Sequence, residues 1–278
     1  ADLIGLDRFE ARKRIVKRLE AEGLLVKQQV HQHAVRHCYR CDTVVEPRLS
    51  DQWFVKMAPL AAPALQAVRD GTVRILPERW NAVYVNWMEG IRDWNISRQI
   101  WWGHRVPVWR CTACQFEKAY RVDPTACEQC GGTLEQDPDV LDTWFSSQLW
   151  PFSTLGWPNE SAEDLRAFYP TDALVTAPEI LFFWVARMIM SGYYCMGRSP
   201  FHTVYLTGTV RDMEHRKMSK SLGNGIDPLD VVAQFGADAM RFTLLQGMGL
   251  GVDVMLDPTD LEKDRKSTRL NSSHIPLS

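Results

Sequence analysis

The pattern of apolar and polar positions is clearest between residues 172 and 210, where two short apolar runs flank a longer one. Leu174-Val-Thr and Thr203-Val-Tyr-Leu-Thr are each typical of a buried strand, and Glu179 to Tyr194 is typical of a largely apolar helix. Together these segments predict a βαβ unit with parallel strands. Ligands bind outside the carboxyl ends of such strands, so the residues after Thr207 are expected at a ligand site.

Helical periodicity predicts further helices on both sides of this unit. Asp7 is suited to cap the first of them and Gly23 to end it. From Val26 to Met57 the apolar runs are short and favour β ribbon over helix. The predicted helices cover residues 7–22, 61–70, 80–91, 228–234 and 237–246.

One of these helices carries a stripe of large side chains. At helical spacing, four apolar residues between 80 and 91 fall on one face, which predicts packed core. They are Trp80, Val83, Trp87 and Ile91.

Composition and charge limit the class of protein. The 278 residues are 45% hydrophobic and 24% charged, as in ordinary globular proteins, which excludes disorder for the bulk of the chain. A formal net charge of -2 excludes a whole-molecule field that attracts nucleic acid, so any RNA contact needs a local patch. No DNA partner is expected.

Nothing in the sequence predicts a membrane segment. The longest apolar stretch, Ile180 to Met190, is interrupted by Arg187 and is shorter than the roughly 18 residues that a span requires. The first residues lack the pattern of a signal peptide, so we expect a cytoplasmic protein. Residues 265–278 have no periodicity and are rich in serine and basic residues, which predicts a disordered tail that is not native sequence.

Six of the seven cysteines form three Cys-x-x-Cys pairs. Two pairs, separated by twelve residues, have zinc-ribbon spacing and predict a tetrahedral structural zinc site; the alternative is a pair of reduced thiol turns. The third pair, Cys38 and Cys41, is half of such a site; its partners are expected in a part of the protein that precedes this sequence, with His33 or His37 as the alternative. Cys195 is predicted to be a core residue. The four predicted zinc ligands are Cys111, Cys114, Cys127 and Cys130.

A basic pentapeptide, Lys217-Met-Ser-Lys-Ser, begins ten residues after the second predicted strand. Flexible lysines on a loop at the carboxyl edge of a sheet are suited to polyphosphate, because they neutralise charge that develops during reaction. With Arg211 and Arg216 they form a predicted local phosphate patch; the alternative is a solvated basic loop. Upstream, Ser97 to Gln99 and His104-Arg105 either touch an RNA end or brace the sheet.

Several long segments carry a resemblance to a known family. Lys217 to Ser221 resembles the KMSKS signature of class I aminoacyl-tRNA synthetases, and the chain is most similar to the valine-specific members of that class. The resemblance also rests on Cys38-Tyr-Arg-Cys with Val45-Glu-Pro-Arg-Leu-Ser-Asp-Gln-Trp-Phe-Val-Lys-Met, Asp93-Trp-Asn-Ile-Ser-Arg-Gln-Ile-Trp-Trp-Gly-His, Leu141-Asp-Thr-Trp-Phe-Ser-Ser and Phe182-Phe-Trp-Val-Ala-Arg-Met-Ile-Met.

The resemblance implies a fold and a reaction. The fold is α/β, the second half of a class I synthetase Rossmann-like nucleotide-binding fold with an inserted zinc ribbon. The reaction is the activation of L-valine by ATP with Mg²⁺, followed by transfer to tRNA(Val). The residues implied are Lys217, Ser219 and Lys220 for catalysis, Gly208, Met218 and Lys220 for ATP binding, and Trp144 and Trp184 for the amino-acid pocket.

The family pattern also includes a His-x-Gly-His element, which none of the seven histidines forms. We therefore expect the isolated chain to be inactive. Two other functions fit parts of the sequence: a stand-alone zinc-ribbon RNA-binding module without catalysis, and a nucleotidyltransferase of the same superfold. Valine chemistry is favoured because a binding module has no use for an amino-acid pocket beside the basic pentapeptide.

The resemblance divides the chain into six segments. They are the exit of an editing domain (1–28), a catalytic-domain segment with a half zinc knuckle (29–108), a zinc-ribbon insertion (109–135), the second half of the Rossmann-like domain (136–246), the start of a stem-contact region (247–264) and the tail (265–278).

Overall fold

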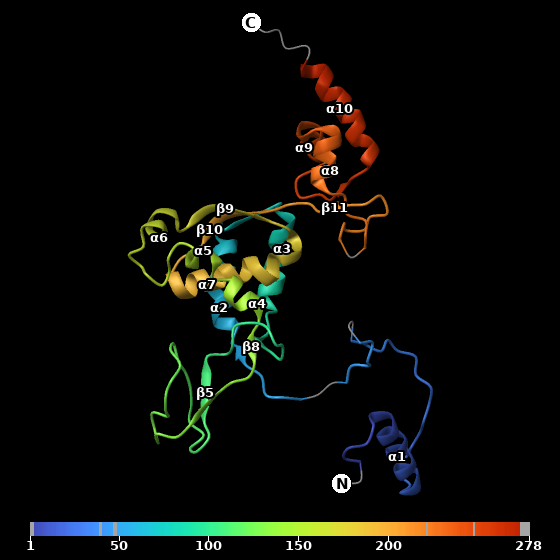
Figure 1. Cartoon of the computed structure of the whole chain (residues 1–278), viewed down its shortest axis with the longest axis vertical. Coiled ribbons are helices and arrows are strands. Elements are labelled where there is room, and N and C mark those ends of the chain that lie inside the picture. Colours follow the sequence, from blue (N-terminus) through green and yellow to red (C-terminus); the bar gives the residue numbers. More distant parts are fainter. Residues whose placement is uncertain (1–2, 39–40, 47–48, 221, 247, 273–278) are drawn as a thin grey trace. The chain divides into compact units, whose positions relative to one another are not determined.

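The computed structural model describes residues 3–38, 41–46, 49–220, 222–246 and 248–272. It separates into two compact units, Ala1–Asp51 and Gln52–Ser278, which are considered one at a time. Figure 1 shows the elements of both units along the chain. No described helix is both long and apolar enough to cross a membrane.

In the described part of the first unit there is one helix, α1 (Arg8–Ala21), and it begins as predicted. The Asp7 carboxylate accepts a hydrogen bond from the backbone N–H of Phe9, and Gly23 adopts a left-handed φ of 68° after the helix ends. The predicted β ribbon is wrong for most of this region. Between residues 26 and 51, the described backbone forms only one isolated bridge, from His37 to Val44, because the apolar runs have no strand beside them.

The second unit is organised by a parallel sheet of order β2-β10-β9, which confirms the predicted βαβ unit. Val204 of β10 (Phe201–Leu206) pairs with Leu174 of β9 (Thr171–Thr176) and with Ile75 of β2 (Arg74–Leu76). All three strands therefore end at the same edge.

The crossover between β9 and β10 is not the single helix that was predicted. It begins as a 3-10 turn, η1 (Pro178–Ile180), continues as a π-helical turn, η2 (Leu181–Val185), and becomes α-helical in α7 (Ala186–Met196). Gly197 ends α7 with a left-handed φ of 71°. The wider π turn carries Trp184.

Helices α2 (Ala58–Arg69) and α3 (Arg79–Glu89) pack with α7 around one core, and α2 and α7 lie side by side (Figure 1). The tryptophan stripe of α3 is only half-buried, and Val83 is 42% exposed. The helix is rotated by about one residue from the predicted face. Its fully buried residues are Tyr84 and Met88.

Short strands build the region around the cysteines. β5 (Val108–Cys111) pairs with β6 (Glu117–Ala119) and β7 (Leu134–Gln136) in an antiparallel sheet. Two further antiparallel pairs are formed by strands that come before and after this sheet in the sequence. They are β1 (Phe54–Val55) with β3 (Trp94–Asn95), and β4 (Ser97–Arg98) with β8 (Val140–Leu141). After β8 come the short helices α4 (Thr143–Ser147), α5 (Trp150–Ser153) and α6 (Glu163–Phe168).

The C-terminal elements surround a small cluster of Val231, Leu256 and Leu261. They are β11 (Val210–Arg211) paired with β12 (Val254–Met255), then α8 (Pro228–Phe235), α9 (Ala237–Gln246) and α10 (Pro258–Ser272).

The expected disorder from residue 265 is wrong over residues 265–272, which continue α10. The Asp257 carboxylate caps the helix by accepting the N–H of Thr259, and Lys263 pairs with Asp260 one turn on. These local interactions favour the helix even though it lacks an apolar stripe. Residues 273–278 lie outside the described residues.

Candidate functional site

The carboxyl ends of β9 and β10 are joined by a hydrogen bond from the N–H of Thr207 to the carbonyl of Thr176, 2.9 Å long. Beyond this edge is an open cavity of about 570 Å³. A ligand-sized space therefore lies where the βαβ unit predicts one. The cavity is lined by Arg79, Trp80, Pro178, Glu179, Thr209, Arg211, Gly251, Val252 and Asp253.

Gly208 follows β10 and lies directly against the backbone of Val252. A Cβ atom added to Gly208 would be 1.9 Å from the carbonyl oxygen of Val252. The glycine is therefore required by the approach of two segments of this chain, a reason that the sequence did not reveal. Its predicted contact with a nucleotide stays a prediction.

Asp212, which the sequence analysis missed, holds the loop that follows β11. Its buried carboxylate accepts hydrogen bonds from the amide of Asn224, the backbone N–H groups of Glu214 and Arg216, and the Arg216 guanidinium. The Asn224 amide, followed by these Arg216 donors, holds the pKa of Asp212 well below its usual range. The Asn224 carbonyl oxygen also accepts the N–H of Ser219, at 2.9 Å.

The four predicted phosphate-binding cations differ in their partners. Arg211 pairs with Asp253, Arg216 with Asp212, and Lys217 with Glu179, the last at 2.9 Å. For Lys220, which is exposed, the described residues supply no carboxylate partner. Among the described residues of the loop, Lys220 is therefore the predicted phosphate-binding cation that is not held by a carboxylate.

The other two residues of the pentapeptide anchor the loop. Met218 is half-buried and packs against the cluster that contains Val231 and Leu261, so its side chain has a structural contact besides its predicted role at ATP. The hydroxyl of Ser219 accepts the N–H of Leu222 at 3.3 Å.

The two predicted pocket tryptophans lie together. Trp144 of α4 and Trp184 of the π turn line a cavity of about 330 Å³. The indole N–H of Trp184 donates to the carbonyl of Ser147 at 2.9 Å, which fixes one wall relative to the other. Three further lining residues, Ser147, Trp150 and Ile180, were not predicted from the sequence. None of its five described lining residues is charged, so the cavity is suited to an apolar side chain.

Asp142 holds Trp144, which forms one wall of the aromatic cavity. One oxygen of its buried carboxylate accepts the backbone N–H of Trp144, and the other accepts the indole N–H of Trp94 and the guanidinium of Arg98. Arg187 stacks over the Trp94 ring at 3.6 Å, and its burial lowers its pKa to about 10.

Two functions were considered for the segment around Arg98, contact with an RNA end and support of the neighbouring strands. The structure shows contacts of the second kind. The Gln99 amide donates to Asp139 at 2.8 Å, and Arg105 donates to the carbonyl of Asp137 at 3.0 Å. These side chains therefore connect β4 and the segment after it to the chain that precedes β8.

The four predicted zinc ligands converge. Their Sγ atoms all lie within 4.8 Å of one another; Cys111 is 3.5 Å from Cys130, and Cys114 is 3.6 Å from Cys127. Four thiolates at about 2.3 Å from a tetrahedral zinc ion would be about 3.8 Å apart, so the cluster fits zinc. A Cβ on Gly132 would be 3.2 Å from two of the sulfurs, which explains a glycine there.

Cys38 and Cys41 of the first unit are held by local hydrogen bonds, and the described residues place no third metal ligand beside them. The N–H of Asp42 donates to the carbonyl of Cys38 at 2.8 Å, and the Cys41 thiol donates to the Thr43 hydroxyl. Among the described residues, the four-cysteine cluster is the one group that brings three or more metal-binding side chains together. The half site at Cys38 and Cys41 stays a prediction.

Comparison with known proteins places this geometry in a family. The profile described as tRNA synthetases class I (I, L, M and V) matches residues 7–257. The valine--tRNA ligase of Thermotoga maritima is 60% identical over 94% of this chain, and that of Symbiobacterium thermophilum is 59% identical over 94%. The chain spans about 30% of the length of these relatives.

Solved structures have the same fold. The ternary complex of Agrobacterium radiobacter K84 agnB2 LeuRS with tRNA and LeuAMS matches 66% of this chain and 28% of its own, with 25% identity and a TM-score of 0.52. Mycobacterium tuberculosis methionyl-tRNA synthetase in complex with methionyl-adenylate matches 86% of this chain and 41% of its own, with 21% identity and a TM-score of 0.62.

Proposed function

This chain belongs to the class I tRNA synthetases, and from that membership we propose that it forms part of the activation site of a valine–tRNA ligase. The reaction joins the carboxylate of valine to the α-phosphate of ATP, with release of pyrophosphate, and then transfers valine from the adenylate to tRNA(Val). We place it in the cytoplasm, which agrees with the fact that none of the seven cysteines forms a disulfide.

The observation that carries the proposal is the position of the short turn η1. Glu179 of this turn lines the cavity at the sheet edge and pairs with Lys217, while its neighbour Ile180 lines the aromatic cavity. An amino-acid side chain in one cavity and a polyphosphate in the other would therefore approach each other across three residues of backbone. Amino-acid activation requires that proximity.

Lys220 is proposed as the main catalytic cation. It is exposed and uncommitted among the described residues, so it can move to the phosphates and stabilise charge as pyrophosphate leaves. Lys217 has the same role but must first leave Glu179. Ser219 holds the turn between them and is proposed to contribute its hydroxyl, and Met218 and Gly208 are proposed to border the nucleotide. ATP would enter with Mg²⁺, which neutralises phosphate charge.

The aromatic cavity is proposed to select valine. Trp144 and Trp184 offer rigid apolar surfaces to an isopropyl group, and Ile180 and Trp150 complete the walls. The absence of charged lining residues favours an apolar side chain over an ionic one.

The four-cysteine cluster is proposed to bind structural zinc. Cys111, Cys114, Cys127 and Cys130 would close a tetrahedral site that leaves no open coordination position for catalysis. The ion would connect the two turns of the β5–β7 sheet.

The test is a chimera in which this chain replaces the matching segment of the Thermotoga maritima enzyme. We expect valine-dependent exchange of pyrophosphate into ATP, and we expect Lys220→Ala to lower kcat about 10²- to 10³-fold with little change in the KM for valine, because the lost charge acts in the transition state. Lys27→Ala, which removes an exposed lysine outside both cavities of the proposed site, is the control. A folded chimera without exchange, or one in which Lys220→Ala is as active as the parent chimera, would exclude the proposed roles.

The isolated chain is proposed to be inactive in the same assay, since its residues contain no His-x-Gly-His element. Measurable exchange by the purified 278-residue chain would contradict this. Tight tRNA binding by the isolated chain, together with an inactive chimera, would favour a zinc-ribbon RNA-binding module instead.

A further inference from the structure

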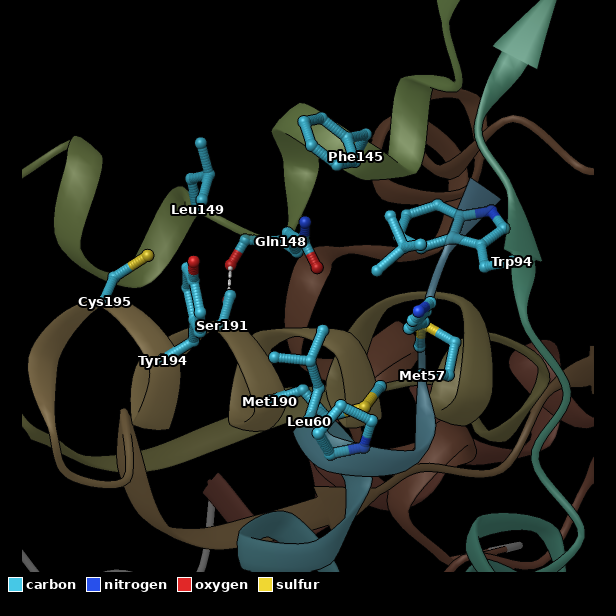
Figure 2. Close-up of a pocket in the computed structure, with 13 residues that line it drawn as sticks. Met57, Leu60, Trp94, Phe145, Gln148, Leu149, Met190, Ser191, Tyr194 and Cys195 are labelled. Atoms are coloured by element: carbon cyan, nitrogen blue, oxygen red, sulfur yellow. Dashed lines mark hydrogen bonds between the residues drawn. The ribbon is translucent and has the colours of Figure 1, made fainter. Parts of the chain in front are cut away.

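A second cavity, of about 500 Å³, lies on the other side of α4 and shares no lining residue with the aromatic cavity. Trp144 and Ser147 face the aromatic cavity, whereas Phe145 and Gln148 face the second one. Figure 2 shows it between the α4 segment and helix α7. The proposed function leaves this space unused.

The walls of the second cavity are mainly apolar. In Figure 2, Leu149 and Phe145 line it from above, Trp94 lines it from the right, and Met57, Leu60 and Met190 line it from below. Met57 and Met190 have flexible, polarizable side chains that adapt to ligands of different shape. Cys195 adds a thiol whose pKa is raised by burial, so it behaves as a neutral, apolar wall. Both the volume and this lining are typical of small-molecule sites.

Polar groups in the cavity are few, and they differ in availability. The Ser191 hydroxyl is committed, because it donates to the carbonyl of Gln148 at 2.8 Å (Figure 2). The side-chain amide of Gln148 has no hydrogen-bond partner among the described residues, so it is available to a ligand. Lys56 is the only charged residue among the thirteen that line the cavity, and none of them carries a carboxylate.

We propose that this cavity binds a small anionic amphiphile, an aliphatic or arylalkyl carboxylate. Its apolar body would replace water along the methionine, leucine and aromatic walls, which is the main source of affinity. Its carboxylate would meet the Lys56 ammonium and the Gln148 amide. Charge complementarity selects this class, because a cationic amphiphile would face Lys56 without any opposing carboxylate in the lining.

The test is isothermal titration of the full chain with three probes that share one tail: octanoate, octanol and octylammonium. We expect octanoate to bind at one site per chain, more tightly than octanol, and octylammonium to bind least well. Lys56→Gln should weaken octanoate about two- to fivefold and leave octanol unchanged, because an exposed ion pair contributes modestly. This variant changes no buried residue, so its folding is not in question.

A second variant tests the location. Leu149→Trp should fill part of the cavity and weaken both octanoate and octanol roughly tenfold or more, whereas Leu245→Trp, on the exposed face of α9, should not. Thermal melting establishes that both variants are folded. The proposal is overturned if the unmodified chain shows no saturable octanoate binding, if octylammonium binds as tightly as octanoate, or if folded Leu149→Trp binds both probes like the parent.

Discussion

The four-cysteine ribbon and the loop of Lys217 to Lys220 are both short motifs, but they depend on different ranges of sequence. In the ribbon, all four candidate ligands and the strands that carry them lie between residues 108 and 136. In the loop region, Lys217 pairs with a carboxylate 38 residues away, and Arg211 pairs with one 42 residues away. Local spacing is therefore enough to specify the ribbon, whereas the charge that the loop presents is decided by the tertiary fold.

Removing metal should have the largest effect, and it should be confined to the ribbon. We expect about one zinc per chain, and we expect Cys114→Ser to abolish its binding and the amide protection of β5 to β7. Structural zinc sites contribute about 10 kcal/mol or more of apparent binding free energy, which is more than the small β5–β7 sheet can replace. Metal analysis and hydrogen exchange measure both outcomes.

Cys195→Ser, at a thiol outside the cluster, is the matched control and should keep its zinc. The sheet β2-β10-β9 shares no strand with the ribbon and should keep its protection in both variants. Undiminished zinc in Cys114→Ser, or loss of protection throughout the parallel sheet, would contradict the local character of the ribbon.

Gly208→Ala tests the tertiary support of the loop. The new methyl would lie 1.9 Å from the Val252 carbonyl, so the two segments must separate, and we expect a loss of about 3 kcal/mol in the free energy of unfolding. Urea unfolding measures it. Gly90→Ala is the control, because its added Cβ would be 3.4 Å from the nearest atom, an ordinary contact. Equal stability of the two variants would show that the segments at 208 and 252 separate without cost.

Asp212 should make the stability of the loop depend on pH, and the geometry of the ribbon predicts no such dependence for the ribbon. Because its folded pKa is depressed, its contribution to stability is complete above about pH 4, the ordinary range of the carboxyl, and is lost as the pH falls through the folded pKa. Asp212→Asn removes this contribution. The urea midpoints of the parent and the variant should therefore differ at pH 7 and converge toward pH 2.

The exposed carboxylate of Asp230 provides the comparison for this experiment. Asp230→Asn should differ from the parent at pH 7 by less than Asp212→Asn does. A difference between the parent and Asp212→Asn that stays constant from pH 7 to pH 2 would mean that the side chain's shape, not its charge, supports the loop.

The parts predicted from the sequence are those with a local signal. The βαβ unit has apolar runs of strand and helix length, the ribbon has ligand spacing, and Trp144 and Trp184 share one cavity as the family resemblance implied. Strand β2 was missed because three residues are too few to establish a period. The π turn was missed because its residues continue the apolar pattern of the helix.

The roles of Asp212 and Glu179 in holding the loop were also missed, but for a different physical reason. The partners of Asp212 include backbone N–H groups, which every residue except proline has, and the partner of Glu179 lies on another segment. Sequence patterns report side-chain periodicity and local spacing, and neither is present in these contacts. The tail was misjudged because α10 is stabilised by its cap, its ion pairs and the buried side chain of Leu261, which do not produce a periodic apolar pattern after residue 264.

The smallest expected effect separates two roles for Glu179, which holds Lys217 at the edge cavity. If the carboxylate competes with phosphate for this lysine, Glu179→Gln in the chimera should lower the KM for ATP about two- to fivefold, since the pair is half-exposed and worth about 1 kcal/mol or less. The difference should disappear at 1 M salt, where the screening length is only about 3 Å. Glu163→Gln, on α6, should leave the KM for ATP unchanged both at low salt and at 1 M salt. A higher KM for ATP would mean instead that Glu179 orients Lys217 toward the phosphates, and the tertiary pairing of the loop would then be part of the active arrangement and not a restraint on it.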